Sequence, residues 1–303
     1  MFFDSHAHFD TFAADGTLPG VLSRAAAASV TRICAVGSEP ASNRLCLSLA
    51  QDRPDLFVAS VGYCCDLADA SPDWSLLSDL AASPAVRAVG EIGLDYYYSP
   101  GNAPAQRALL ARSLDFALSK RLPVIIHTRD ADDDTYSALR DFAAAWRALP
   151  PPPPSAARIP PSDSALRSTV LRQLARVSPP LPPPPPGVIH CFTRSLDLAE
   201  RFVALGFLVS FSGILSFNNA APLRDAAARL PLDALLVETD SPYLAPKPYR
   251  GRVNEPAYVT RVAEVLAEAK QLPLPLVASA TFANACRLFQ IPAPPGANER
   301  KNP

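Results

Sequence analysis

Eight short apolar runs, separated by segments with helical periodicity, most restrict the fold that this 303-residue chain can adopt. Each run is rich in hydrophobic and β-branched residues and shows little polar alternation, which is typical of strands in a parallel sheet that is covered on both faces. The runs span residues 2–5, 32–36, 57–61, 86–92, 124–127, 188–191, 207–211 and 235–238. Eight such units in series predict a single α/β domain, folded as a (β/α)8 TIM barrel.

Five of the segments between the runs are rich in alanine and leucine, with charged residues spaced along an outer face. This periodicity predicts amphipathic helices at residues 18–29, 41–51, 105–120, 196–205 and 259–270. The 49% of hydrophobic residues is ample for a barrel core of this size. The barrel is expected to occupy residues 1–291, and residues 292–303 are expected to form a disordered tail.

A proline-rich insertion interrupts this pattern at about residues 150–186, between the fifth and sixth predicted strands. Two proline runs flank residues 162–177, which have the pattern of one amphipathic helix. Polyproline lacks backbone donors and resists packing, so we expect the insertion to be extended and partly mobile. An inert spacer is favoured over a ligand for an SH3 or WW domain.

Composition restricts the partners and the compartment. The 28 basic and 29 acidic residues nearly balance, so a polyanion would have to be held by a local site. The six cysteines lack Cys-x-x-Cys spacing, and no apolar run approaches the ~20 residues that span a bilayer. No hydrophobic signal core precedes His6. We expect a reduced, soluble, cytoplasmic protein without membrane contact, and the sequence gives no strong indication of a protein partner.

All four histidines of the chain lie where predicted strands end. His6 and His8 follow the first run, His127 ends the fifth, and His190 lies near the end of the sixth. The carboxyl ends of barrel strands form the face on which active sites assemble. The two imidazoles of a His-x-His segment point to opposite faces in a regular strand, but they converge on one ion where the strand ends.

Two carboxylates share this placement. Glu91 interrupts the apolar fourth run, and Asp240 follows the eighth. A carboxylate inside an apolar run is costly to bury unless it binds a cation or pairs with a base, so Glu91 is the candidate bridging ligand. Asp240 is both a candidate ligand and a candidate proton acceptor, which makes Glu91 and Asp240 the candidate catalytic residues.

The combined set of four imidazoles and two carboxylates needs no thiolate. It suits two divalent ions, Zn²⁺, Mn²⁺ or Mg²⁺ or a mixture. Six ligands shared between two ions leave positions for water and a substrate oxygen, which predicts a hydrolase. Each residue alone has a structural alternative, such as a hydrogen-bonded core histidine, a salt-bridged glutamate or a turn-capping aspartate. Their coincidence on one predicted face favours the metal site. Cys191 is expected to be a buried apolar thiol.

Six segments carry a more specific signal. They read DSHAHFD at residues 4–10, GEIGLDYY at 90–97, LPVIIHTRD at 122–130, VIHCFT at 188–193, ETDSPYLAP at 238–246 and RGRVNEP at 250–256. Together they span nearly the whole chain outside the insertion, and they resemble the TatD family of metal-dependent DNases, within the amidohydrolase-like barrels. The resemblance implies one ion held by His6, His8, Glu91 and Asp240, and a second held by Glu91, His127 and His190. It also implies phosphodiester hydrolysis on DNA, with removal from a 3′ end of single-stranded DNA as the expected mode.

Candidate substrate contacts lie in loops on the same predicted face. Four basic residues there can hold phosphate oxygens, namely Arg129, Lys247, Arg250 and Arg252. Tyr96 and Tyr97 can stack an unpaired base. The alternative is that these tyrosines pack the rim and that the basic residues form a solvated face.

One segment departs from the family pattern. Where the family carries Gly-x-His-Pro after the third strand, this chain reads GYCCD at residues 62–66. Cys64 cannot donate a proton as an imidazolium does, and Cys64 and Cys65 are expected to remain two thiols. The departure keeps two alternatives open: a hydrolase of esters, lactones or amides, such as an aminoacyl-tRNA ester deacylase, and an inactive scaffold whose insertion recruits a partner. The complete ligand set favours a two-metal DNase.

Overall fold

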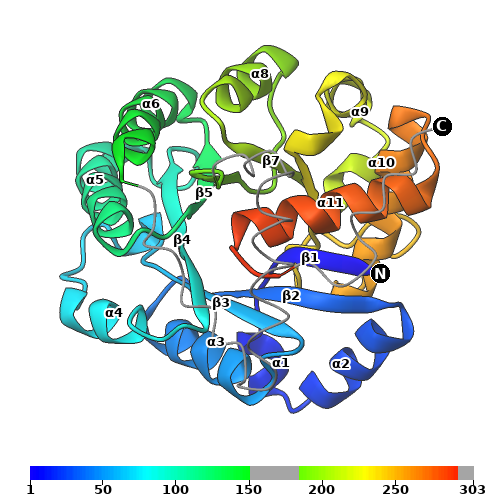
Figure 1. Ribbon diagram of the computed structural model, residues 1–303, viewed down its shortest axis with the longest axis horizontal. Helices are drawn as coiled ribbons and strands as arrows, with labels where there is room; N and C mark the ends of the chain where they lie inside the picture. Colours follow the sequence, from blue (N-terminus) through cyan, green and yellow to red (C-terminus); the bar gives the residue numbers. More distant parts are fainter. Residues whose placement is uncertain (151–183, 293–303) are drawn as a thin grey trace, which may run out of the picture.

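A computed structural model describes residues 1–150 and 184–292, and within them eight parallel strands form one sheet (Figure 1). The strands are β1 (Phe2–Ala7), β2 (Val30–Val36), β3 (Phe57–Val61), β4 (Val86–Asp95), β5 (Val124–Arg129), β6 (Gly187–Ile189), β7 (Leu208–Phe211) and β8 (Leu235–Val237). Each strand pairs with the next one in sequence. The predicted eight-stranded barrel of TIM type is therefore confirmed, and β4 is three residues longer than the 86–92 run indicates.

The sheet closes nearly into a barrel where the first strand meets the end of the last. Ala7 forms a parallel bridge with Ser241. The amide of Asp240 donates to the carbonyl of His6 at 2.9 Å, and the amide of His8 donates to the carbonyl of Ser241 at 2.8 Å. This closure places His6 and His8, which lie near the start of the sequence, beside Asp240 and Ser241, which follow the last strand.

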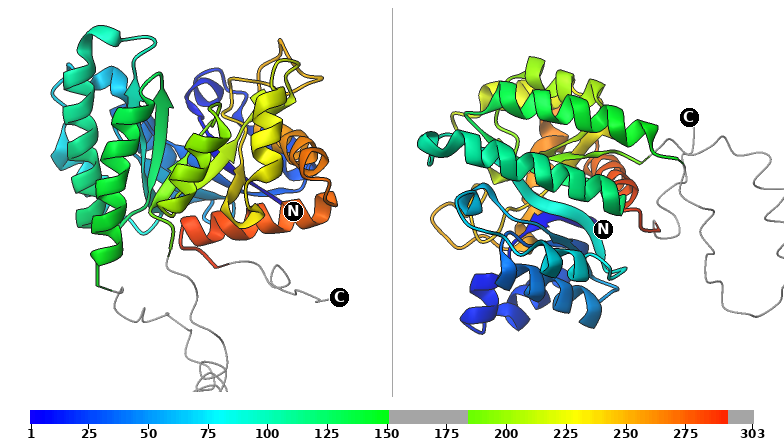
Figure 2. Two further views of the ribbon diagram at one scale, coloured as in Figure 1. Left: turned by 90° about the horizontal axis from the view of Figure 1, so that it is seen from above. Right: turned by 90° about the vertical axis from the view of Figure 1, so that its left-hand side faces the viewer.

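Helices surround the sheet (Figures 1 and 2). They are α1 (Asp10–Ala14), α2 (Leu18–Ala27), α3 (Pro40–Asp52), α4 (Trp74–Leu80), α5 (Ala103–Lys120), α6 (Asp132–Ala148), α8 (Leu196–Ala204), α9 (Ala221–Arg229), α10 (Val259–Lys270) and α11 (Leu274–Leu288). Short 3-10 turns occur at Cys65–Leu67, Pro100–Asn102, Gly213–Ser216, Leu232–Ala234 and Pro256–Tyr258. The five predicted helices are confirmed to within two residues at each end.

Helix α6 shows a periodic signal that the five predictions did not use. Its buried residues include Leu139, Phe142, Ala143 and Trp146, which have the i, i+3, i+4, i+7 spacing of one helix face. Acidic residues occupy its first turn and Arg147 its last, as the helix dipole favours. The helix follows the fifth strand directly and is as regular as α5.

The barrel interior is filled by side chains from all eight strands. One core cluster contains Phe3, Cys34, Val36, Val58, Ala88, Ile125, Val188, Leu208 and Leu236, together with residues of the α11 segment. Such layers make the interior a packed core rather than a pore. Burial of each large apolar side chain contributes about 1.5–3 kcal/mol.

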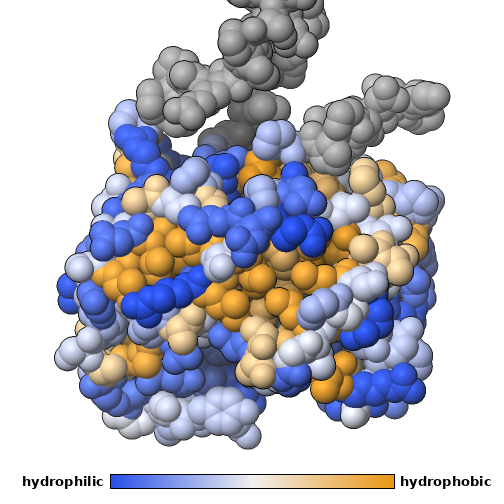
Figure 3. Space-filling view, turned by 90° about the horizontal axis from the view of Figure 1, so that it is seen from below, coloured by the Kyte–Doolittle hydropathy of each residue, from blue (hydrophilic) through white to orange (hydrophobic). Residues whose placement is uncertain are grey.

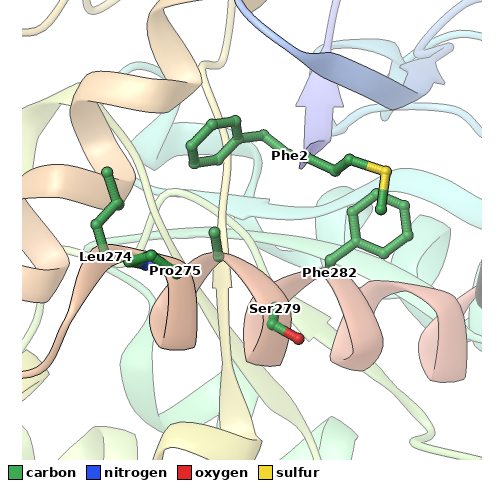
Figure 4. Close-up of a pocket in the computed structure, with 7 residues that line it drawn as sticks. Phe2, Leu274, Pro275, Ser279 and Phe282 are labelled. Atoms are coloured by element: carbon green, nitrogen blue, oxygen red, sulfur yellow. The ribbon is translucent and has the colours of Figure 1, made fainter. Parts of the chain in front are cut away.

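Helix α11 crosses the amino-terminal end of the barrel (Figures 1 and 2). The ring of Phe3 lies 5.6 Å from that of Phe282 and 5.5 Å from that of Phe289, measured between centroids. An apolar cavity of about 300 Å³ opens there between Phe2 and the start of α11 at Leu274 (Figure 4). This end of the barrel is therefore closed by hydrophobic contacts, and the strands' carboxyl ends lie at the opposite end.

Two further features concern the outside of the molecule. On the side formed by α1 to α4, apolar side chains gather in a band between polar ones (Figure 3). Within the described ranges, none of the helices is both long and apolar enough to cross a membrane.

The predicted insertion and tail fall almost entirely outside the described residues. This applies to the proline runs, to the helix predicted at residues 162–177, and to the tail after residue 292. The two ends of the insertion are described: the indole of Trp146 in α6 donates to the carbonyl of Pro184 at 3.1 Å, and Arg121 donates to the carbonyl of Pro150 at 2.6 Å. Pro150 and Pro184, the described residues on either side of 151–183, are thus both held by hydrogen bonds from the barrel.

Candidate metal centre

The two histidines of the first strand converge because the strand ends between them. β1 ends at Ala7, and the Nε2 atoms of His6 and His8 lie 3.1 Å apart. His8 Nδ1 lies 3.1 Å from the carbonyl oxygen of Val36, to which only a protonated Nδ1 can donate. A neutral His8 therefore presents a lone pair at Nε2, facing the ring nitrogen of His6. Two such nitrogens at this distance require a proton or a cation between them.

Glu91 lies between this pair of imidazoles and a second pair. Its Oε2 is 3.6 Å from His6 Nε2 and 3.5 Å from His8 Nε2. Its Oε1 is 3.2 Å from His127 Nδ1 and 3.0 Å from His190 Nε2. Each carboxylate oxygen thus faces one pair, which is the arrangement expected of a bridging ligand.

The backbone around Glu91 explains how a residue inside a strand points at this cluster. The sequence placed Glu91 at the end of the fourth strand, but β4 continues to Asp95. The β4–β5 register shifts between Val89 and Ile92, and the amide of Glu91 donates to the carbonyl of Gly37 at 2.7 Å instead of joining the β5 ladder. Such an irregularity redirects a side chain out of the regular alternation.

Glycine at position 93 allows β4 to press against β5 beside His127. Gly93 has φ +155°, and a Cβ atom there would lie 2.0 Å from the carbonyl oxygen of His127. Gly62, just after β3, also lies close to the Gly90–Glu91 backbone, where a Cβ atom would be 2.8 Å from the carbonyl carbon of Gly90. The glycines of this segment are therefore required by the close approach of neighbouring strands.

Asp240 completes the cluster on the side of His6 and His8. Its Oδ1 lies 3.7 Å from the Nε2 atom of each. The side chain is 13% exposed, whereas the His6 side chain is fully buried. In the described chain, two groups of residues have possible ligand atoms within 4.8 Å of one another, close enough to share one ion. They are His6 with Glu91 and His190, and His6 with His8 and Asp240. These groups contain five of the six residues singled out from the sequence, and the sixth, His127, joins them through the 3.2 Å approach of its Nδ1 to Glu91 Oε1.

The protonation of the cluster is set by burial and by the facing charges. Burial alone would raise the pKa of Glu91, but His190 and His127 lower it well below its usual range. Burial would lower the pKa of His127, but Asp95 and Glu91 raise it to about 9. Burial raises the pKa of Asp240 despite the nearby histidines. In the metal-free protein, protons are shared among these crowded nitrogen and oxygen atoms. Divalent cations can replace the protons, because cations bind the same lone pairs.

Two carboxylates behind the imidazoles were missed by the sequence analysis. Glu238, fully buried, has its Oε1 3.4 Å from His190 Nδ1 and accepts the amide proton of Cys191 at 2.6 Å. Asp95 has its Oδ2 3.2 Å from His127 Nε2. Such partners fix the orientation of metal-binding histidines. The sequence held a partial signal, because Glu238 ends the apolar eighth run and a buried carboxylate needs a partner, but it did not show which histidine each acid would face.

Cys191 differs from its predicted environment. It is half-buried rather than buried, and its Sγ lies 3.2 Å from the hydroxyl of Ser212. The strand alternation used for the prediction does not apply, because β6 ends at Ile189 and Cys191 has φ +44°. Burial and the neighbouring acids Asp240 and Glu238 raise the pKa of its thiol.

Cys64 lies half-buried just beyond β3, where the family histidine would be. Its amide donates to the carbonyl of Ser38 at 2.9 Å. Burial raises the pKa of the thiol to about 11, so Cys64 is neutral at physiological pH. Cys64 and Cys65 are both free thiols, as predicted.

The predicted substrate residues at the end of β5 and just after β4 are placed differently from one another. Tyr96 is half-buried, and its hydroxyl donates to Asp134 Oδ2 at 2.6 Å. Tyr97 and Tyr98 are 57% and 70% exposed, so the accessible rings are these two rather than Tyr96. Arg129 ends β5 and stacks over both exposed rings.

The three other basic residues lie in the segment that follows β8. Lys247 donates to the side-chain oxygen of Asn218. The guanidinium of Arg250 lies 4.0 Å from the ring centroid of Phe217, and Arg252 is exposed. The contacts of Lys247 and Arg250 are thus with Asn218 and Phe217 rather than with the histidines of the cluster.

Comparisons with known proteins agree with the geometry. Residues 3–290 match the family model described as TatD related DNase. The metal-dependent hydrolase YcfH of Escherichia coli (strain K12) is 36% identical over 293 residues, covering 96% of this chain and 96% of that protein. The metal-dependent hydrolase TatD of Mycobacterium tuberculosis is 32% identical over 296 residues, covering 94% and 97%. The crystal structure of the TatD homolog YjjV from Escherichia coli K12 has a TM-score of 0.76 at 30% identity, covering 96% of this chain and 98% of that one.

Proposed function

This chain belongs to the TatD-related DNase family of metal-dependent hydrolases, and on that premise we propose that it hydrolyses phosphodiester bonds of single-stranded DNA, shortening the strand from its 3′ end. The observation that carries the proposal is the position of Glu91, with one oxygen toward His6 and His8 and the other toward His127 and His190. A carboxylate shared in this way is what a pair of ions a few ångströms apart requires.

We assign the ligands accordingly. One divalent ion would be held by His6, His8, Glu91 and Asp240, and a second by Glu91, His127 and His190. Divalent ions held there supply Lewis acidity, which polarises a phosphoryl oxygen and activates water at neutral pH. Zn²⁺, Mn²⁺ and Mg²⁺ are each compatible with this mixture of nitrogen and oxygen donors.

The protein's own residues have separate tasks in this proposal. Asp240 accepts a proton from the attacking water, because its carboxylate is partly exposed at the edge of the cluster. Glu91 stays ionised, and its two oxygens keep the two pairs of imidazoles in a fixed position relative to each other. Arg129 and the basic residues after β8, Lys247, Arg250 and Arg252, bind phosphate oxygens along the strand.

The test is degradation of 3′- and 5′-labelled single-stranded DNA by metal-stripped protein that is resupplied separately with Mg²⁺, Mn²⁺ or Zn²⁺. We expect metal-dependent shortening from the 3′ end that is lost in Glu91→Ala and in Asp240→Asn. Glu268→Gln is the matched control, because Glu268 is an exposed acid on the outer helix α10. Wild-type protein that leaves both labels intact with every metal would refute the proposal.

A second candidate function is hydrolysis of a carboxylic ester or amide, such as the aminoacyl ester of a mischarged tRNA. It is favoured by Cys64, a neutral thiol at a position where the family carries an imidazole, since a phosphodiester's leaving oxygen gains most from a nearby proton donor. A panel of small esters, lactones and amides, assayed with the same metals, separates the two activities. Turnover of neither DNA nor these substrates would favour an inactive scaffold.

A further inference from the structure

Exposed aromatic rings gather around the candidate metal centre. Within the described residues, the large hydrophobic side chains that are exposed are Met1, Tyr97, Tyr98, Tyr243, Val253 and Leu276. The three tyrosines in this set are 57%, 70% and 61% exposed, and each is tied to a residue of the cluster or to its direct partner. Exposed aromatic rings beside a catalytic cluster are available to stack on unpaired bases.

Tyr97, Tyr98 and Arg129 form one surface, here called the platform. The two rings meet edge to face with centroids 5.0 Å apart. The Arg129 guanidinium carbon lies 3.9 Å from the Tyr97 centroid and 4.6 Å from the Tyr98 centroid. A guanidinium stacked on rings keeps its N–H donors at its edge, where they can meet a phosphate.

Asp95 fixes the platform to the half of the cluster that contains His127. Its Oδ1 accepts the amide protons of Tyr97 and Tyr98, each at 2.9 Å. Its other oxygen, Oδ2, lies 3.2 Å from His127 Nε2. One buried carboxylate therefore sets both the orientation of His127 and the backbone that carries the exposed rings.

Tyr243 lies beside the other half of the cluster. Its ring centroid is 6.3 Å from that of His8, with the planes at 66°. Its amide donates to the carbonyl of Asp240 at 2.9 Å, and its own carbonyl accepts from the side chain of Asn254. The backbone of Tyr243 is thus held in place while its ring is free to receive a partner.

We propose that the platform and Tyr243 bind two unpaired nucleobases, one on each side of the phosphodiester bond that is cut. The platform serves the side of His127, Tyr243 serves the side of His8, and Glu91 lies between them beneath the bond. Aromatic rings stack every base and so give no sequence preference, but they require bases that are not paired. This inference rests on the proposed DNase function and gives it a physical basis for selecting single strands.

The test compares two oligonucleotides of the same length, cut by the metal-loaded enzyme at a bond that has been mapped with the wild type. One has normal bases throughout, and the other has abasic residues on both sides of that bond. On the normal strand, Tyr243→Ala and the double variant Tyr97→Ala/Tyr98→Ala should each lower kcat/KM about 10-fold or more, chiefly through KM. On the abasic strand the wild type should already be slow, and the variants should change little further.

Arg201→Ala is the control for disrupting a stacked tyrosine–arginine contact away from the centre, because the Arg201 guanidinium lies 3.9 Å from the ring centroid of Tyr136 on the outer helices. Arg201→Ala should leave both rates unchanged. Equal losses on the two strands in the tyrosine variants would overturn the inference while leaving the nuclease intact, since damage to the fold slows both substrates alike. Absence of cleavage of either strand by the wild type would overturn the proposed function itself, and this inference with it.

Discussion

At the scale of single residues, the candidate centre depends on carboxylates that serve more than one imidazole. Residue types and their place at strand ends sufficed to predict the six residues that converge, because a polar group in an apolar run needs a partner. They did not identify Asp95 or Glu238, because a sequence does not show which ring nitrogen of a histidine faces inward. That choice depends on side-chain orientation across neighbouring strands.

Glu238→Gln tests the role of the carboxylate behind His190. The amide keeps the size of the side chain but removes the negative charge 3.4 Å from His190 Nδ1. Metal affinity should fall about 10- to 100-fold. The melting temperature of the metal-free protein should stay close to that of the wild type. Isothermal titration with Zn²⁺ or Mn²⁺ measures the affinity, and Glu268→Gln serves again as the control. Unchanged affinity would show that Glu238 has only a structural role.

Metal binding should release protons at neutral pH. His127 is an imidazolium below about pH 9 in the metal-free protein, because Asp95 and Glu91 raise its pKa to about 9 against the effect of burial. A metal binds only the neutral imidazole, so its affinity should increase as the pH rises and level off near pH 9. Calorimetry at pH 7 in two buffers with different ionisation enthalpies measures the protons released. Identical heats in the two buffers would contradict this account.

At the scale of elements, β4 does most to position the centre, and it is the strand that differs most from its prediction. The apolar runs located all eight strands, because buried parallel strands need continuous hydrophobicity. The register shift between Val89 and Ile92 could not be predicted, since it results from the contacts of Glu91 with Gly37 and of Gly93 with His127. These contacts join residues that are distant in sequence.

Gly93→Ala tests this tight packing. The added methyl group would lie 2.0 Å from the carbonyl oxygen of His127, and the backbone φ of +155° is unfavourable for alanine. The free energy of unfolding should fall by about 1–3 kcal/mol or more, and metal binding should weaken because His127 is displaced. Urea denaturation measures the first effect. Gly101→Ala, where no atom lies within 4 Å of the new Cβ, should stay within about 0.5 kcal/mol of the wild type.

At the scale of the whole molecule, we propose that residues 1–291 form one hydrolase barrel and that the proline-rich insertion is dispensable to it. The contacts Trp146 to Pro184 and Arg121 to Pro150 hold the two ends of the insertion against the barrel. Loop-closure entropy changes only slowly with loop length. Composition alone predicts where the barrel pattern is interrupted, because proline runs cannot continue a strand or a helix.

Replacing residues 151–183 by a short Gly/Ser linker tests this division. The shortened protein should keep its metal-dependent activity and its melting temperature to within a few degrees, because the described contacts of β5, α6 and β6 are unaltered. Activity assays and thermal unfolding followed by circular dichroism provide the measurements. Loss of activity with an unchanged fold would assign the insertion a role in catalysis or substrate recruitment.

The closure of β1 against the end of β8 has a consequence for synthesis of the protein on the ribosome. Ala7 forms its β-bridge with Ser241, which is synthesised more than 200 residues later. The buried carboxylate of Asp4 accepts the amide and hydroxyl protons of Thr239 at 2.9 and 2.6 Å. The half of the centre that uses His6 and His8 therefore cannot form until residue 240 has emerged. A chain truncated before residue 239 lacks Thr239, Asp240 and Ser241, so it lacks a complete centre and should show no metal-dependent hydrolysis.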